Sequence, residues 1–280
     1  MHVARDVAGL KQIDNYITTH WHADHFGGIP RVAQQIPVIN FYDHGIPDKL
    51  SSDISAELMA AYKQTSQGKS VTLKPGDEIK LKSVKSTPAL NLKIVAAGGH
   101  VLGEPSDTPQ IVPCGNEFKP KALDTSDNVN SVGFVLSFGK FQFFDGGDLT
   151  WNIENRLVCP KNIPGVVDVY QTDHHGLDQS NDPTLVHALH PTVAIMNSGP
   201  RKGGEAGTFA TLKSTPGLDA IYQVHRNVRT TVNDNAPPDY VANDDEACKG
   251  EFIKLSVSAD SNSYTVEIPS KNISRSYRTK

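Results

Sequence analysis

Six consecutive residues constrain the fold and the chemistry of this 280-residue chain more strongly than any other segment does. Residues 20–25 read HWHADH, and four of these six side chains can bind a metal ion. Residues 13–18 predict a strand before the cluster, so His20 and His22 can point the same way from an extended backbone. Asp24 and His25 lie past a bend and can face a second ion. Such ligands suit Zn²⁺, although manganese and iron also bind them, so we expect a two-ion centre.

The hydrophobic pattern along the chain alternates strands with helices, which predicts an α/β fold with a mixed sheet or a pair of sheets. Residues 103–127 are rich in Pro, Asp, Gly and Asn and predict a long surface loop. Strands are expected at residues 13–18, 38–42, 92–97, 131–138, 141–144, 166–171, 192–196, 220–224, 252–257 and 264–268. Helices are expected near residues 7–10, 31–35, 51–67, after 148 and at 183–189.

Residues that can carry chemistry recur just past the ends of these strands. Asp145 and Asp148 follow the strand at 141–144, and His174 and His175 follow the strand at 166–171. Sites in layered α/β folds collect at such strand ends. These strand ends are therefore candidate positions for a functional site.

The motif His-x-His-x-Asp-His after a strand, followed by Gly27-Gly28, resembles the metallo-β-lactamase superfamily. That resemblance implies an αββα sandwich, with residues 1–280 as one hydrolase domain. The segment FFDGGDL at 143–149 resembles the strand end whose aspartate bridges both metals. By position the bridging residue is Asp148, and Asp145 is structural.

One branch of that superfamily is favoured by the later motifs. Residues 167–176 run from a strand into His-His-Gly, as in the hydrolase domain of the competence DNA-uptake channel and in phosphorylcholine esterases. Residues 180–183, 191–197 and Asn128-x-x-Ser131 also fit, and the resemblance covers residues 13–200 well. In the wider superfamily the last metal ligand is commonly a histidine next to glycine, which favours His175 as the ligand and His174 as a residue that supports it or contacts substrate, although the motif leaves either histidine of the pair open as the ligand.

The chain departs from the family pattern in two ways. Many members have a further metal-binding histidine before the bridging aspartate, and the one candidate here, His100, lies well upstream of it. Asn128 and Ser131 occupy about the right region and are expected to contact the substrate or the metal-bound water. The first cluster also begins early, at residue 20, so we expect some of the family's N-terminal strands to be lacking. An exposed sheet edge would result, which a homodimer would cover.

Other polar residues are weaker candidates. Lys202, next to Arg201, is expected to bind an anionic substrate. Asp43-His44 and His225-Arg226 follow strands and could line a cleft, whereas His187 and His190 are expected to be structural. The cysteines at 114, 159 and 248 form no C-x-x-C pair, and we favour three unrelated cysteines over one disulfide with a free thiol.

Composition narrows the class of substrate. The net charge is −4 and no basic stripe with interleaved aromatics occurs, which argues against nucleic acid and favours a small molecule. No run approaches the roughly 20 apolar residues that span a bilayer. A soluble protein is therefore expected, periplasmic or secreted if a signal peptide precedes this sequence. Its compartment is otherwise unknown.

The expected reaction is hydrolysis by a metal-bridging hydroxide, because two cations lower the pKa of a bound water. Asp148 would bridge the ions, Asp24 would position the hydroxide and His174 would assist at the substrate. A small phosphoester is the favoured substrate. The alternatives are a cyclic amide or ester, such as a β-lactam or lactone, and a non-catalytic metal-binding protein.

Overall fold

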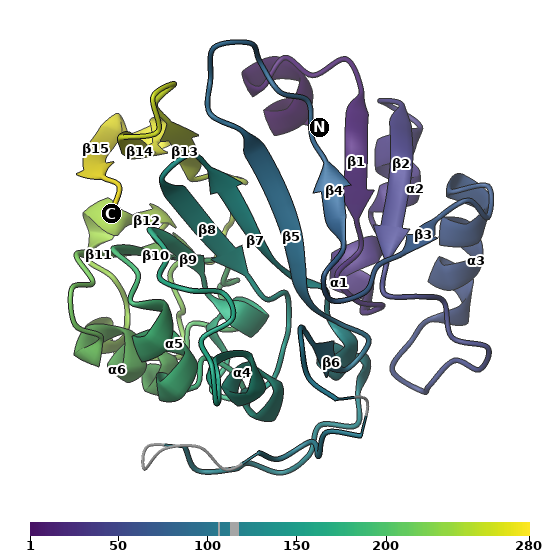
Figure 1. The fold of residues 1–280 in the computed structure, drawn as a ribbon. Coiled ribbons are helices and arrows are strands. Elements are labelled where there is room, and N and C mark those ends of the chain that lie inside the picture. Colours follow the sequence, from purple (N-terminus) through teal and green to yellow (C-terminus); the bar gives the residue numbers. More distant parts are fainter. Residues whose placement is uncertain (106, 113–117) are drawn as a thin grey trace.

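The computed structural model describes residues 1–105, 107–112 and 118–280. Two β layers face one another, with helices on their outer sides (Figure 1). The α/β prediction is therefore confirmed. The six helices of the described residues are α1 (Ala23–Phe26), α2 (Ile29–Ala33), α3 (Ala56–Thr65), α4 (Trp151–Val158), α5 (Pro183–Leu189) and α6 (Ala206–Ser214).

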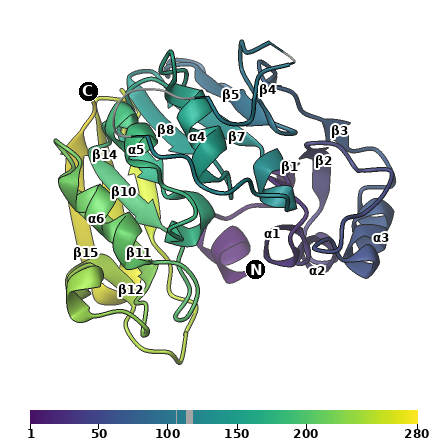
Figure 2. The ribbon, with the colours of Figure 1, turned by 90° about the horizontal axis from the view of Figure 1, so that it is seen from below.

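One β layer contains a small parallel sheet in the order β1 (Ile13–Ile17), β2 (Val38–Asp43) and β3 (Val71–Thr72). Helices α1 to α3 pack on its outer face through a cluster that includes Trp21, Phe41 and Tyr62. The strand that leads into the histidine cluster, β1, lies at the edge of this sheet. Figure 2 shows these elements gathered on one side of the molecule.

The other β layer is a nine-stranded mixed sheet in the order β12-β11-β10-β9-β8-β7-β5-β4, with β6 paired to β5. Strands β8 to β12 run parallel, and β4 to β8 are antiparallel neighbours. Their bounds are β4 (Glu78–Lys80), β5 (Leu90–Ala97), β6 (His100–Val101), β7 (Gly133–Phe138), β8 (Phe141–Asp145), β9 (Val169–Gln171), β10 (Val193–Met196), β11 (Ala220–His225) and β12 (Val241–Asn243).

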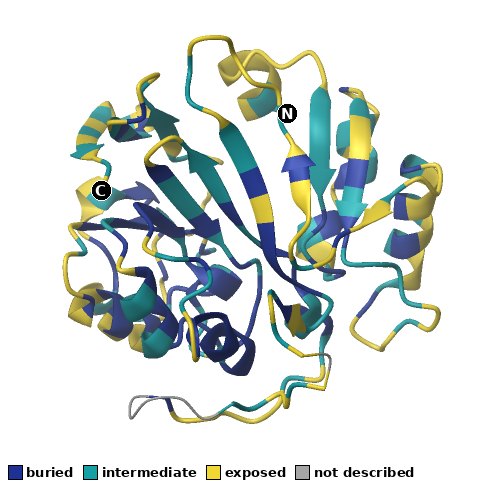
Figure 3. Cartoon of the chain, viewed as in Figure 1, coloured by how far each residue is buried: buried dark blue, intermediate teal, exposed yellow. Residues whose placement is uncertain are grey.

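The nine-stranded sheet is buried on both faces. Its outer face packs on α4 to α6, and α4 is buried from Asn152 to Val158 (Figure 3). Its inner face packs on β1 and β2 through Ile17 and Tyr42. Beside them lies a third, antiparallel sheet of β13 (Lys254–Val257), β14 (Ser263–Ile268) and β15 (Ile273–Arg278). Buried strands such as β10, whose four residues are all apolar, fit this double burial.

Most predicted elements are present within a few residues of their expected bounds. The strand expected from residue 166 begins at Val169, and the N-terminal helix is a short turn at Val3–Val7. Helices α1 and α6 and strands β6, β12 and β15 were not predicted. Other short helical turns are Asp127–Asn130, Asp173–Gly176, Val232–Asp234, Pro238–Tyr240 and Pro269–Lys271.

The favoured interpretation of three unrelated cysteines is wrong for Cys159. Cys159 is disulfide-bonded, whereas Cys248 is a free, exposed thiol. Cys114 lies outside the described residues. Within the described part of the chain, none of the helices has the length and apolar content that crossing a bilayer requires.

Candidate metal centre

Three strand ends deliver the predicted metal ligands to one place. The chain leaves β1 at His20, leaves β8 toward Asp148, and leaves β9 toward His174 and His175. Strands β8 and β9 are parallel neighbours, so their carboxyl ends meet at the same edge of the sheet. Residues about 150 positions apart are thereby brought into contact: His25 Nε2 lies 3.2 Å from His175 Nε2.

Two clusters of potential metal ligands result. His20, His22 and Asp148 form one, and Asp24, His25 and His175 form the other, each with its ligand atoms within 4.8 Å of one another. All six residues that the sequence predicted as metal ligands belong to these clusters.

Asp148 occupies the middle of the arrangement. Its Oδ2 atom lies 3.6 Å from His20 Nε2, 3.3 Å from His25 Nε2, 3.6 Å from His174 Nε2 and 3.5 Å from His175 Nε2. The Asp148 backbone N–H donates to Ser131 Oγ at 3.2 Å, and this hydrogen bond fixes the position of Asp148. One carboxylate oxygen is thus shared by imidazoles of both clusters, as a bridging ligand would be.

The chemistry of this donor set fits metal ions. His20 Nε2 lies 3.0 Å from His22 Nδ1, and His25 Nε2 faces His175 Nε2 at a similar distance. Two facing ring nitrogens can share at most one proton, so lone pairs converge with the Asp148 oxygen. A cation between them is the usual partner of such a set, and imidazole with carboxylate suits Zn²⁺.

The outer nitrogens of the rings are held by other groups, which fixes the ring orientations. His22 Nε2 lies 3.0 Å from Asp53 Oδ2, and His175 Nδ1 lies 3.1 Å from the Asn197 carbonyl oxygen. His22 therefore turns Nδ1 toward the centre, whereas His175 turns Nε2.

His174 is oriented by Ser180. The Ser180 hydroxyl donates to the Leu149 carbonyl oxygen at 2.7 Å, so it accepts from His174 Nδ1, 3.2 Å away. The Nδ1 atom thus carries the proton and Nε2 keeps its lone pair. That lone pair faces Asp148 and the Asn128 amide nitrogen, which lies 3.5 Å away.

The backbone between β9 and the centre is strained. His174 and His175 both adopt left-handed conformations, with φ of 51° and 57°. Such conformations are costly for residues with a β-carbon and are concentrated at functional sites. In an extended chain consecutive side chains point to opposite faces, whereas this turn brings both imidazoles to Asp148.

Glycines on neighbouring segments make room for that turn. A β-carbon on Gly203 would lie 2.0 Å from the His175 carbonyl oxygen, and one on Gly146 would lie 2.6 Å from the Asp173 carboxyl oxygens. The Gly204 N–H donates to the His175 carbonyl at 3.0 Å. The Gly203-Gly204 pair therefore supports the turn at His175.

Charges inside the centre compensate one another. Burial lowers the pKa of His20 to about 3, so its ring is neutral. Burial would also lower the pKa of His175, but its hydrogen bonds to Asp148 and Asp24 outweigh burial and raise it to about 9. Burial opposes ionisation of Asp148, yet hydrogen bonds from His175 and His25 hold the pKa of that carboxyl well below its usual range.

The predicted substrate residues have different surroundings. Asn128 is buried beside His174, and its Oδ1 has no hydrogen-bond partner. Ser131 is fully buried under Asp148 and so positions that residue, which differs from the expected contact with substrate. The Lys202 ammonium forms an ion pair with Asp24, and both side chains are about half exposed, at 49% and 46%.

Several weaker candidates lie outside the two clusters. His100 is exposed and lies 3.6 Å from Glu104, so it does not supply the further histidine ligand. His44 pairs with Asp127, which accepts from the Trp21 N–H inside the first cluster. Asp43 accepts from Tyr62 and from the Gly45 N–H. Arg201 pairs with Glu246, and His225 is buried. His187 lies in α5, and His190 is the residue at the C-terminal end of that helix. Asp145 accepts hydrogen bonds from the Gly147 N–H and the Gln171 side chain.

Comparison with known protein families gives a match for the N-terminal part of the chain. A family model described as the metallo-beta-lactamase superfamily matches residues 4–100, which include the first cluster but not Asp148 or His175. A search of curated proteins found no match.

Solved structures show weak likenesses. A putative metal-dependent hydrolase from Parabacteroides distasonis has 17% identity, with 76% of this chain and 77% of that chain covered and a TM-score of 0.40. YhfI from Bacillus subtilis, a metallo-beta-lactamase fold protein, has 9% identity, coverage of 79% and 80% and a TM-score of 0.43. The diiron beta-hydroxylase CmlA from Streptomyces venezuelae has 15% identity and a TM-score of 0.38, and the match covers 66% of this chain but 35% of CmlA.

Proposed function

We propose that this chain is a metal-dependent hydrolase of the metallo-β-lactamase superfamily that acts on a small phosphoester at a dinuclear zinc centre. The observation that carries the proposal is the position of Asp148 Oδ2, within 3.6 Å of ring nitrogens from both ligand clusters. The family model that matches residues 4–100 supports the superfamily. The competence-related branch remains a prediction.

The residues divide the work as follows. His20, His22 and Asp148 would hold one ion, and Asp24, His25 and His175 would hold the other, with Asp148 shared. When bound, the ions would supply an activated water and would polarise the scissile phosphoryl oxygen. The Asp24 carboxylate, which is paired with Lys202, would orient that water.

Three side chains beside the ligands support the choice of a phosphoester. The buried Asn128 amide and the His174 ring form one wall, and the Lys202 ammonium lies at the exposed side of the centre. The Asn128 amide donor and the Lys202 cation complement the charged oxygens of a phosphoryl group, whereas His174 Nε2 can accept a proton. Proton transfer by His174 requires no movement of its ring, because Ser180 already fixes Nδ1.

Hydrolysis of a cyclic amide or ester is the second candidate, favoured by the matched family model. Zinc-loaded protein should be assayed on bis-p-nitrophenyl phosphate, a chromogenic cephalosporin and a lactone. We expect turnover of the phosphodiester, and turnover of the cephalosporin or the lactone alone would favour the second candidate. Bound zinc without turnover of any of the three would favour a non-catalytic metal-binding protein.

The matched variants are Asp148→Asn and Asp145→Asn. Asp148→Asn should bind fewer than two zinc ions and lose activity by about 100-fold or more, because the charged oxygen shared by both clusters is removed. Asp145→Asn should keep both ions, because Asp145 belongs to neither ligand cluster. Its amide oxygen can still accept from the Gly147 N–H, 2.8 Å away, and only the hydrogen bond from Gln171 is lost. Activity that survives Asp148→Asn or complete chelation would exclude the proposal.

A further inference from the structure

The cluster of Asp24, His25 and His175, which we call the second cluster, has a protein cation among its contacts. The Lys202 ammonium pairs with Asp24 Oδ2, and both side chains of this ion pair are about half exposed. The same oxygen atom lies 3.3 Å from His175 Nε2 and 3.7 Å from His25 Nε2. The ammonium therefore binds the oxygen that Asp24 turns toward the other members of the cluster.

The backbone around Lys202 is held by hydrogen bonds. The Gly199 N–H donates to the Lys202 carbonyl oxygen at 2.8 Å. The Asn227 amide donates to the carbonyl oxygens of Gly203 and Gly204, at 2.7 and 3.2 Å. The lysine side chain, by contrast, has a flexible four-carbon stem. Its ammonium can therefore change partners while the loop keeps its conformation.

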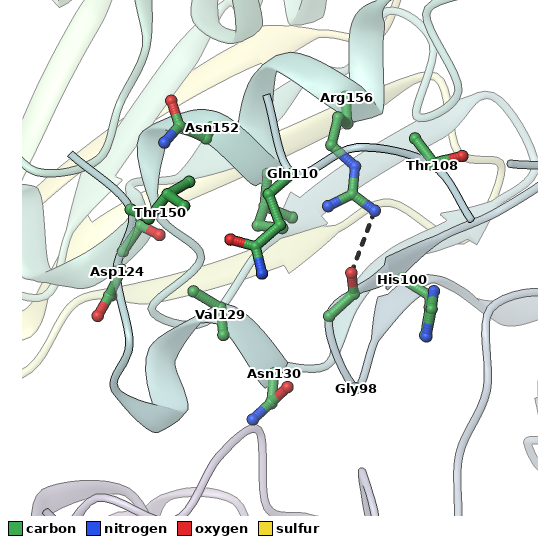
Figure 4. Close-up of a pocket in the computed structure, with 13 residues that line it drawn as sticks. Gly98, His100, Thr108, Gln110, Asp124, Val129, Asn130, Thr150, Asn152 and Arg156 are labelled. Carbon is green, nitrogen blue, oxygen red and sulfur yellow. Dashed lines mark hydrogen bonds between the residues drawn. The ribbon is translucent and has the colours of Figure 1, made fainter. Parts of the chain in front are cut away.

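Two cations on neighbouring segments are engaged outside the two ligand clusters. Arg201 pairs with Glu246. Arg156 donates to the Gly99 carbonyl oxygen at 3.1 Å, in a pocket whose described lining contains no member of either cluster (Figure 4). Of these three cations, Lys202 alone has a proposed metal ligand as its partner. Its availability therefore depends on what else Asp24 binds.

A metal ion and the Lys202 ammonium would compete for Asp24. Both would bind the same carboxylate oxygen, and two cations so close together repel one another. An ion at the second cluster has the larger charge and two imidazoles as further ligands, so the ammonium would be the one to leave. After leaving, it would remain close enough to donate hydrogen bonds to the oxygens of an anion bound at the centre.

We propose that Lys202 is an exchangeable partner of Asp24, whose ammonium turns to the anionic group of the substrate when a metal ion binds the second cluster. The proposal rests on the proposed function in taking the substrate to be an anion. While the ammonium is paired with Asp24, its charge is largely neutralised and is less available to a phosphoryl oxygen. Metal binding and anion binding are thereby coupled, and loss of the ammonium should change the two affinities in opposite directions.

Lys202→Gln tests the exchange without relying on turnover. Competition with a zinc-binding chromophore, in buffer free of multivalent anions, measures zinc affinity. We expect the product of the two zinc association constants to rise about fivefold, because the repulsion of the ammonium is removed. Titration calorimetry of the zinc-saturated protein with methylphosphonate, whose C–P bond is not hydrolysed, should show binding about fivefold weaker than in the wild type.

Arg201→Gln is the matched control. It removes the same charge from the same exposed loop, but from a side chain whose partner, Glu246, belongs to neither ligand cluster. Both substitutions are at exposed positions and should leave the fold intact, which circular dichroism checks. The control should change neither affinity by more than about twofold.

A lower zinc affinity in Lys202→Gln would mean that the ammonium supports Asp24 as a ligand, and would overturn the exchange. Zinc or methylphosphonate binding that is unchanged, or that changes equally in the control, would also overturn it. Opposite changes in a protein that hydrolyses none of the three assay substrates would leave the exchange standing and refute the proposed function. Turnover of the phosphodiester without opposite changes would refute the exchange and leave the proposed function standing.

Discussion

At the scale of single residues, the orientation of His22 depends on a carboxylate that is not a ligand. Asp53 Oδ2 lies 3.0 Å from His22 Nε2 and also accepts from the Asp127 N–H at 2.9 Å. Burial opposes ionisation of Asp53, but hydrogen bonds from Ser51, from the Asp127 backbone and from His22 hold its pKa well below the usual range. The anion therefore selects the His22 tautomer that presents Nδ1 to the centre.

Removing this carboxylate should weaken metal binding without removing a ligand. We expect Asp53→Ala to lower zinc affinity about 10- to 100-fold, the usual effect of losing the partner of a ligating histidine. Competition with a zinc-binding chromophore measures it. Asp48→Ala, at an exposed position of the same loop, is the control. Equal zinc affinities of Asp53→Ala and the control would contradict the argument.

The sequence predicted the six clustered ligand residues but not the residues that orient them. His20 to His25 are adjacent, and Asp148 and His175 stand at strand ends, so local patterns reveal them. Asp53 is 31 residues from His22, and Asn197 is 22 residues from His175. Neither has the spacing of a ligand motif, because only the folded chain places it against a ring.

At the scale of elements, the left-handed turn at His174 and His175 is held by the loop that carries Gly203. Gly203→Ala should destabilise the protein by about 2 kcal/mol or more, because the new β-carbon would meet the His175 carbonyl oxygen at a φ of +72°. Gly250→Ala isolates the backbone cost, since φ is +73° there and no atom lies within 4 Å. That control should lose about 1 kcal/mol. Equal losses in denaturant unfolding would show that the contact with His175 is unimportant.

A buried carboxyl pair joins α4 to the same turn. Glu154 accepts from the Asn181 and Asp182 N–H groups at 2.7 and 2.8 Å and is hydrogen-bonded to Asp173. Burial raises the pKa of Glu154 to about 7 and raises that of Asp173 well above its usual value. Tyr170, Asp182 and Lys121 are the other titratable groups whose charges act on Glu154 or are acted on by it.

The raised pKa of Glu154 determines how its contribution to stability changes with pH. A carboxyl whose folded pKa exceeds its unfolded value binds protons more tightly when folded, so its stabilisation is fully present below about pH 4.5 and is lost as pH rises through about 7. The free energy of unfolding of the wild type, relative to Glu154→Gln, should therefore fall between pH 5 and pH 8. Urea unfolding at several pH values measures it. A difference that is constant or rises with pH would contradict the assignment.

Helix α6 shows why some elements escaped prediction. Backbone N–H groups at its N-terminus donate to the Asp178 carboxylate. Thr208 N lies 2.7 Å from Asp178 Oδ1, although the two residues are 30 positions apart in the sequence. No residue at its own start provides a side-chain cap. By contrast α5 has Asp182 as its local cap and Pro183 in its first turn, and its predicted bounds, 183–189, are confirmed. A distant cap is invisible to local sequence patterns.

At the scale of the whole molecule, the two β layers meet through Ile17 and Tyr42 on one side and Ile94 and Leu136 on the other. The alternation of strands and helices predicted an α/β fold, but the assignment of strands to two sheets came only from resemblance. Parallel pairing of β9, β10 and β11 follows from their connecting helices α5 and α6. Which sheet receives β1 depends on contacts between distant apolar residues, and these have no local signature.

The proposed metal ligands come from both β layers, so metal binding should stabilise the whole fold. His20, His22, Asp24 and His25 follow β1 of the small sheet, whereas Asp148 and His175 follow β8 and β9 of the large one. Ions that bind only the folded arrangement add stability by mass action, about 1.4 kcal/mol per site for each tenfold rise in free zinc above the dissociation constant. We expect the melting temperature to rise steadily with buffered free zinc and to fall on chelation. Asp148→Asn should show a shallower rise, because its sites no longer share a charged oxygen between the layers. A melting temperature that is independent of zinc in the wild type would mean that the two halves of the centre do not bind metal together.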